Sequence, residues 1–241
     1  MKVAAAQINV TESKSDNLKK MLEYMKKARN SDVICFPELS LQCDQGNIHS
    51  IEKEIEKLCK ASIEYNLNLI FGAYIKLNGK IKNRIFIINR NGKIIHQYNK
   101  RHPYIAEEEY LSKGRNNKPF DLDGVCCAVI NCWDYAFPEY GRDLAAHGAK
   151  VIFCPAYLIS HPRTKNVLRK IPQVRAFDYM SYFIMVDAVA EDTFKKSKIC
   201  HPLRQLRSIK NKEGIIYADL DISEIDKLRK EFKNFRGKVL F

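Results

Sequence analysis

The 241-residue sequence lacks any apolar run long enough to span a membrane, because its longest apolar stretches have the length of strands. The first residues turn polar too early for a secretory signal peptide. No linker, low-complexity segment or fixed-period repeat divides the chain. We therefore expect a soluble, cytoplasmic protein without a membrane partner, folded as a single domain over residues 1–241.

Several catalytic motifs are also missing. The sequence has no Gly-x-Ser-x-Gly segment, which marks the nucleophile turn of many serine hydrolases, and no Cys-x-x-Cys pair for zinc or redox chemistry. Its six histidines include no pair at the helical i, i+4 spacing that suits a metal ion. We predict neither a metal site nor a cofactor.

Cysteine and positive charge are abundant. Of the eight cysteines, Cys35, Cys126, Cys127 and Cys154 lie inside apolar, strand-like runs, so reduced thiols are expected rather than a disulfide framework. The formal net charge is +13, but the basic residues are dispersed. Their densest segment, 195–212, has no interleaved aromatic residues for base stacking. This pattern favours a basic, solvated surface over nucleic-acid binding, and leaves an acidic substrate open.

Strand-like and helical patterns alternate along the chain. Short apolar runs at 32–36, 124–130 and 150–154 predict buried strands, the last closed by Pro155. Asn-Gly pairs at 78–79 and 91–92 predict hairpins of an antiparallel meander. The second half of the chain repeats the arrangement of the first and includes a helix over 167–179. This pattern indicates an α/β fold with a layered, sheet-based core.

Three reactive side chains follow predicted strands: Glu38, Lys100 and Cys132. Taken singly, they are also typical of a solvated carboxylate, a surface lysine and a buried thiol. Together they supply a base, a cation and a nucleophile, which are the groups that acyl transfer by a thiol requires. A nearby ammonium is expected to favour the charged forms of the thiol and the carboxylate.

Three segments in this order resemble the signatures of the nitrilase (carbon-nitrogen hydrolase) superfamily. They are Phe-Pro-Glu-Leu at 36–39, Tyr-Asn-Lys-Arg-His at 98–102, and Cys-Trp-Asp at 132–134 followed by Phe-Pro-Glu at 137–139. The resemblance covers nearly the whole chain and is to the amidase-like branch. It implies a four-layer α-β-β-α sandwich of two mixed sheets flanked by helices, and a homodimer paired through helices.

The resemblance also implies roles. Cys132 would attack an amide or nitrile carbon, Glu38 would take the thiol proton and later activate water, Lys100 would stabilise the tetrahedral intermediate, and Glu107 would orient the site. The expected reaction is hydrolysis of a small linear amide or carbamoyl compound through a cysteine acyl-enzyme, with release of ammonia or amine. A catalytically idle binding protein and an acyltransferase with the same triad remain alternatives.

Aromatic and polar residues near these strand ends are candidates for the substrate pocket, although aromatic residues in such places also build cores. The candidates are Tyr104, Trp133, Tyr135, Tyr157 and His161. The second half departs from the family pattern: Asp187 stands where an asparagine usually ends a strand, and segment 195–204 lacks its usual glycines. We expect the hairpin in that segment to be built differently or to be mobile.

Overall fold

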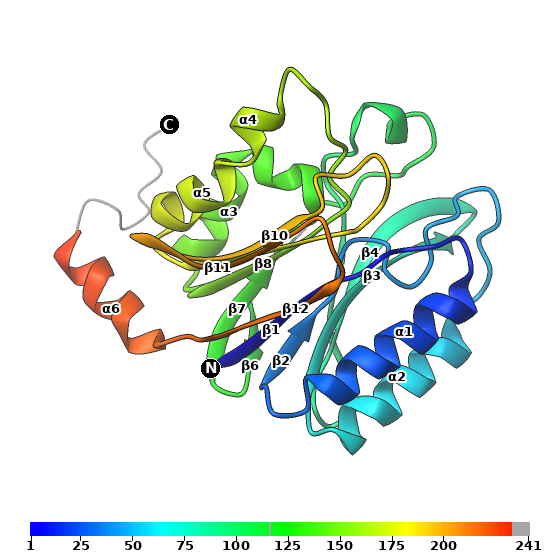
Figure 1. The fold of residues 1–241 in the computed structure, drawn as a ribbon, viewed down its shortest axis with the longest axis horizontal. Helices are drawn as coiled ribbons and strands as arrows, with labels where there is room; N and C mark the ends of the chain where they lie inside the picture. Colours follow the sequence, from blue (N-terminus) through cyan, green and yellow to red (C-terminus); the bar gives the residue numbers. More distant parts are fainter. Residues whose placement is uncertain (116, 233–241) are drawn as a thin grey trace.

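Two six-stranded sheets form the centre of the computed structural model, which describes residues 1–115 and 117–232 (Figure 1). The first sheet contains β1 (Lys2–Gln7), β2 (Val33–Cys35), β3 (Asn68–Leu77), β4 (Lys80–Ile88), β5 (Ile94–Asn99) and β12 (Gly214–Asp219). The second contains β6 (Phe120–Leu122), β7 (Val125–Val129), β8 (Val151–Ala156), β9 (Tyr182–Asp187), β10 (Lys196–His201) and β11 (Arg204–Lys210). Their orders are β12-β1-β2-β3-β4-β5 and β11-β10-β9-β8-β7-β6.

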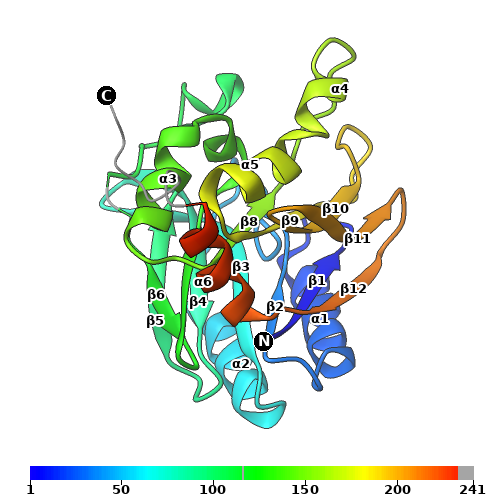
Figure 2. The ribbon, with the colours of Figure 1, turned by 90° about the vertical axis from the view of Figure 1, so that its left-hand side faces the viewer.

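Helices cover the outer faces of both sheets. The helices of the described residues are α1 (Lys14–Lys27), α2 (Glu52–Glu64), α3 (Pro138–Ala146), α4 (Lys165–Leu168), α5 (Ile171–Tyr179) and α6 (Ile222–Glu231), with short 3-10 turns η1 (Ile105–Glu107) and η2 (Cys132–Ala136). In two perpendicular views α1 and α2 lie next to β1–β3, whereas α3 and α5 lie beside β8–β10 (Figure 1, Figure 2). The predicted four-layer α-β-β-α sandwich is confirmed. Within the described part of the chain, no helix is long and apolar enough to cross a membrane.

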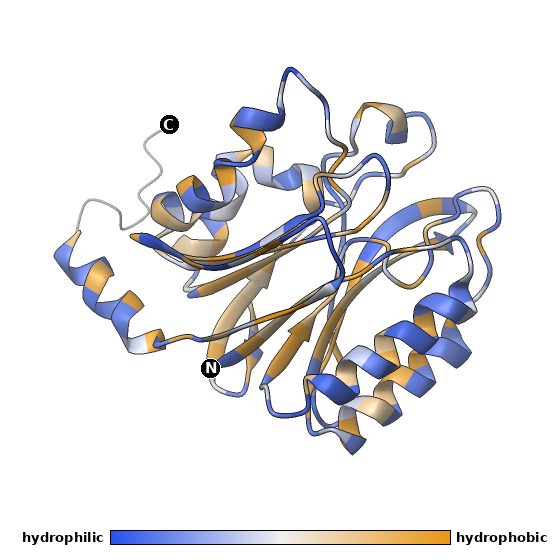
Figure 3. Cartoon of the chain, viewed as in Figure 1, coloured by the Kyte–Doolittle hydropathy of each residue, from blue (hydrophilic) through white to orange (hydrophobic). Residues whose placement is uncertain are grey.

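Each sheet has three parallel strands at its centre, β1-β2-β3 in one and β7-β8-β9 in the other, with antiparallel strands outside them. Alternate residues of a strand face opposite sides of its sheet. In β1, Val3 and Ala5 therefore join the core between the sheets, whereas Ala4 and Ala6 pack toward the layer of α1 and α2. Burial on both faces explains why the central strands are mostly apolar (Figure 3).

Both hairpins that the sequence predicts around residues 78–79 and 195–204 are present in the structure. Asn78 and Gly79 join β3 to β4 with φ of 50° and 73°, as the predicted tight hairpin requires. The altered segment 195–204 does form a hairpin, β10-β11, whose connection is Pro202 and Leu203 rather than a glycine turn. That hairpin is therefore built differently, as one of the two expectations had it.

Two local predictions are wrong. Pro155 does not close its strand but lies within β8; because β7 pairs with β8 only as far as Phe153, the proline sits where β8 has a partner on one side only. The single helix predicted over 167–179 is divided into α4 and α5. Pro172 lies in the first turn of α5, where the missing N–H is tolerated and a new helix begins readily.

Candidate active site

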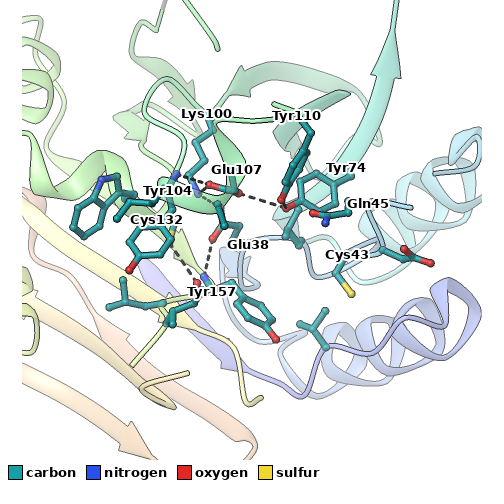
Figure 4. Close-up of a pocket in the computed structure, with 18 of the residues that line it drawn as sticks. Glu38, Cys43, Gln45, Tyr74, Lys100, Tyr104, Glu107, Tyr110, Cys132 and Tyr157 are labelled. Carbon is teal, nitrogen blue, oxygen red and sulfur yellow. Dashed lines mark hydrogen bonds and ion pairs between the residues drawn. The ribbon is translucent and has the colours of Figure 1, made fainter. Parts of the chain in front are cut away.

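The candidate residues follow four strands, and the ends of these strands lie close together. Glu38 follows β2, Lys100 follows β5, Cys132 follows β7, and Tyr157 follows β8. Because the central strands of each sheet run parallel, their carboxyl ends lie at one edge, and the sandwich brings the edges of the two sheets together. Glu38, Lys100 and Cys132 are each at most 4% exposed and line a common cavity (Figure 4).

The Lys100 ammonium bridges two carboxylates. Its Nζ lies 2.7 Å from Glu38 Oε1 and 2.6 Å from Glu107 Oε2. The Tyr157 backbone N–H donates to Glu38 Oε2 at 2.8 Å, and the Tyr104 backbone N–H donates to Glu107 Oε2 at 2.7 Å. Every one of these partners donates, so both carboxyl groups act as hydrogen-bond acceptors.

Asn83 connects the two carboxylates from inside β4. Its Nδ2 donates to Glu38 Oε1 at 2.7 Å and to Glu107 Oε1 at 3.2 Å, and its Oδ1 accepts from Asn131 Nδ2 at 2.8 Å. Asn83 is 1% exposed and does not line the cavity. Sequence reasoning missed it, because one polar residue in a strand is equally typical of the solvent face.

Cys132 adopts an unusual backbone conformation, with φ of 49° in the left-handed region that few residues other than glycine occupy. The turn is held by Asp134, which is fully buried. Its Oδ2 accepts from the Asn131 N–H at 3.1 Å and from the Tyr98 hydroxyl at 2.7 Å, and its Oδ1 accepts from the His102 N–H at 2.8 Å. Asp134 thereby joins the Cys132 turn to the segment that carries Lys100. Its position inside the Cys-Trp-Asp motif was the signal for this role.

The resting thiol is neutral. Burial raises the pKa of Cys132 well above its ordinary value, the Glu38 carboxylate raises it further, and Lys100 opposes both. Lys100 therefore favours the thiolate, as expected, but burial and the Glu38 carboxylate outweigh its effect on the pKa of the thiol. Burial would lower the pKa of Lys100, but Glu38, Cys132 and Glu107 raise it well above its ordinary value, so it stays an ammonium. Burial also raises the pKa of Glu38, against the effect of Lys100.

The cavity measures about 820 Å³, within the usual range for a small-molecule site. Tyr104, Trp133, Tyr157 and His161 line it together with Glu107, as the sequence predicts. Tyr135 does not. It is 1% exposed and packs in the core between the sheets, because the 3-10 turn η2 points residues 133 and 135 in different directions. Tyr74 and Tyr110 also line the cavity, and sequence reasoning missed both.

Asp187, which stands in place of the family's asparagine, is buried behind the Tyr157 segment. Its Oδ1 accepts from the Leu158 and Ala188 N–H groups at 3.0 and 3.1 Å, and its Oδ2 accepts from the Lys196 N–H at 3.2 Å. Burial raises the pKa of Asp187 to about 8 despite these donors. The Asp187 carboxyl therefore links the backbone of Leu158, which lines the cavity, to that of Lys196 in β10. Its pKa lies near neutral pH.

The fold and this cluster of carboxylates, ammonium and thiol define a cysteine-dependent hydrolase site. The sequence model of the carbon-nitrogen hydrolase family matches residues 2–230, and the chain belongs to this family. Its reaction class is hydrolysis of carbon-nitrogen bonds of the amidase kind. Within the described residues, no group of three or more His, Cys, Asp or Glu side chains is placed to hold a metal ion.

Similar proteins include amidases from distant organisms. The 2-oxoglutaramate amidase of Bacillus subtilis (strain 168) is 26% identical, with 97% of this chain and 95% of that protein covered. The N-carbamoylputrescine amidase of Oryza sativa subsp. japonica is 22% identical, with 98% and 91% covered. The carbon-nitrogen hydrolase from Helicobacter pylori G27 shares the fold, with a TM-score of 0.91, 18% identity, and coverage of 100% of this chain and 96% of that one.

Replacing Asn83 with leucine tests whether it positions the two carboxylates. We expect kcat for an amide substrate to fall about 10- to 100-fold while KM changes little, because the side chain lies outside the cavity. Glu38 also loses a donor to its ionised form, so the acid limb of the pH–rate profile should move to higher pH. Asn68→Leu is the control, since Asn68 is equally buried in β3 but donates to Asp32 and Asp123. A purely structural role predicts the same pH profile for both variants.

Asp187→Asn should change the pH dependence of stability. The folded-state pKa of Asp187, about 8, exceeds the unfolded value of about 3.9, so this group's contribution to stability is present at low pH and is lost as pH rises toward 8. An asparagine cannot ionise, so the Tm of the variant relative to wild type should increase between pH 5 and pH 8. The exposed Asp219→Asn variant is the control. A Tm difference that is the same at both pH values contradicts the prediction.

Proposed function

We propose that this protein hydrolyses a small linear amide or carbamoyl compound through a covalent acyl intermediate on Cys132, with release of ammonia or amine. One observation carries the proposal: the thiol, the Glu38 carboxylate and the Lys100 ammonium meet in one cavity. The names of the similar proteins, which include amidases for 2-oxoglutaramate and N-carbamoylputrescine, support the same chemistry.

In the first step the Glu38 carboxylate takes the thiol proton as Cys132 sulfur attacks the amide carbon. Removing the proton during attack suits a thiol whose pKa burial has raised. The amide oxygen becomes an oxyanion, which the Lys100 ammonium stabilises. Glu107 shares that ammonium with Glu38, and so keeps it charged and fixed in place.

Collapse of the intermediate breaks the carbon-nitrogen bond. The leaving nitrogen takes the proton from Glu38 and departs as ammonia or amine, which leaves a thioester on Cys132. Glu38, again ionised, removes a proton from water as the water attacks the thioester carbon. Breakdown of this second intermediate returns the proton to the sulfur and releases the carboxylic acid.

The remaining inferences about organisation are also proposals. Residues 1–241 form one carbon-nitrogen hydrolase domain, which the match over residues 2–230 supports. The protein acts in the cytoplasm, consistent with eight unpaired cysteines. It forms a homodimer through the helices beside the second sheet, where Val167 and Val174 are 63% and 49% exposed. Sedimentation equilibrium distinguishes one copy from two.

Ammonia release across a panel of primary amides and carbamoyl compounds tests the reaction. Wild type should release ammonia, and Cys132→Ala should reduce the rate at least about 10³-fold, because Cys132 is the thiol beside Glu38 and Lys100, whereas Cys43 lies at the other end of the cavity. Cys59→Ala, which changes a cysteine of α2 outside the cavity, should keep wild-type activity. Added hydroxylamine should yield a hydroxamate from the same intermediate, and a hydroxamate formed without any hydrolysis would indicate an acyltransferase instead.

The proposal fails if no compound of the panel releases ammonia, which is the result expected of an idle binding protein. It also fails if Cys132→Ala retains the wild-type rate.

A further inference from the structure

The cavity has a second end, away from Cys132. Cys43 and Gln45 lie there, and the Tyr157 ring extends toward them from the catalytic end (Figure 4). Two carboxylates, Glu12 and Asp44, line the cavity at this second end. Both carboxylates lie close enough to Cys43 to affect its pKa, since burial, then Glu12, then Asp44 raise the pKa of Cys43 to about 11. The second end therefore carries negative charge.

Nothing in the cavity balances that charge. Within residues 1–115 and 117–232, neither Glu12 nor Asp44 forms an ion pair, and Asp44 Oδ1 accepts only the Gly46 N–H, at 2.9 Å. Lys100, the one lysine of the described lining, is bound to the two catalytic carboxylates. His161 Nδ1 accepts the Arg163 backbone N–H at 3.3 Å. An acidic cavity in a chain of formal net charge +13 is a local feature, unlike the surface as a whole.

Aromatic side chains also line the cavity, and the Tyr157 ring is the one that extends toward the second end (Figure 4). Five aromatic side chains line the cavity: Tyr74, Tyr104, Tyr110, Trp133 and Tyr157. Four of these rings form two edge-to-face pairs: the ring centroids of Tyr104 and Trp133 are 5.2 Å apart, and those of Tyr74 and Tyr110 are 6.2 Å apart. Aromatic faces attract an ammonium group, and rings combined with unpaired carboxylates are the usual way to bind one.

We infer that the substrate carries an amino group at the end remote from the scissile amide, and that Glu12 and Asp44 select it. This inference rests on the proposed amidase function. A protonated amine at the second end gains two carboxylates and the Tyr157 ring, which extends toward that end (Figure 4). A carboxylate at the same end would face two carboxylates, with no lysine or arginine of the described lining free to bind it. The cavity therefore discriminates by the charge of the distal group.

Three amides of equal length test the inference: 5-aminopentanamide, pentanamide and the monoamide of glutaric acid. They have the same five-carbon chain and the same primary amide, and differ in a distal charge of plus one, zero or minus one. We expect kcat/KM to be highest for the amine and at least roughly tenfold higher than for the acid at low ionic strength. Added salt should reduce the ratio, because the second end is open to solvent at Glu12.

The double variant Glu12→Gln, Asp44→Asn should reduce the amine-to-acid ratio of kcat/KM toward one. Glu64→Gln, which removes one negative charge from an exposed position on α2, should leave the ratio at its wild-type value. A wild-type preference for the acid, equal rates for all three compounds, or a ratio that survives in the double variant overturns the inference. So does failure of wild type to hydrolyse any of the three. The proposed amidase function is tested separately, and it stands as long as the broader panel releases ammonia at a rate that depends on Cys132.

Discussion

The Lys100 ammonium lies between the carboxylates of Glu38 and Glu107 in a region that water hardly reaches. Burying three charges is costly, and the cost is offset only when each charged atom has a well-placed partner. Here the charged groups and their partners come from four separate segments: Glu38 after β2, Asn83 in β4, residues 100–107 after β5, and the backbone N–H of Tyr157 after β8. The site therefore exists only when both sheets and the loop after β5 are in place.

This arrangement explains why the thiol is kept neutral until substrate arrives. The cluster already holds one ammonium between two carboxylates, and a thiolate would add a further negative charge to a buried site. Glu38 touches Lys100 on one oxygen and the Tyr157 segment on the other, so it is fixed beside the thiol. A base positioned in this way can accept the proton at the moment of attack. The same Tyr157 segment forms the cavity wall that leads to Glu12 and Asp44.

Sequence patterns predicted the layered α/β fold and the grouping of Glu38, Lys100 and Cys132, because strand ends and Asn-Gly turns have strong local signals. The order of the three motifs then indicated the family. Tyr135 was misplaced because the direction of a side chain in a 3-10 turn depends on the turn geometry. Asn83, Glu12 and Asp44 lie outside the motifs, and their roles depend on contacts between segments far apart in the chain. Patterns within one segment carry no such information.

The central claim is that the ammonium of Lys100 makes two buried carboxylates tolerable, and thermal unfolding of Lys100→Met tests it most directly. Without the ammonium, the pKa of Glu38 should rise further above its unfolded value, so the variant's stability should be lost as pH rises. We predict a deficit in Tm relative to wild type that is small at pH 5 and large at pH 8, where it corresponds to about 3–5 kcal/mol of unfolding free energy. A deficit that is absent at pH 8, or equal at the two pH values, would contradict the account.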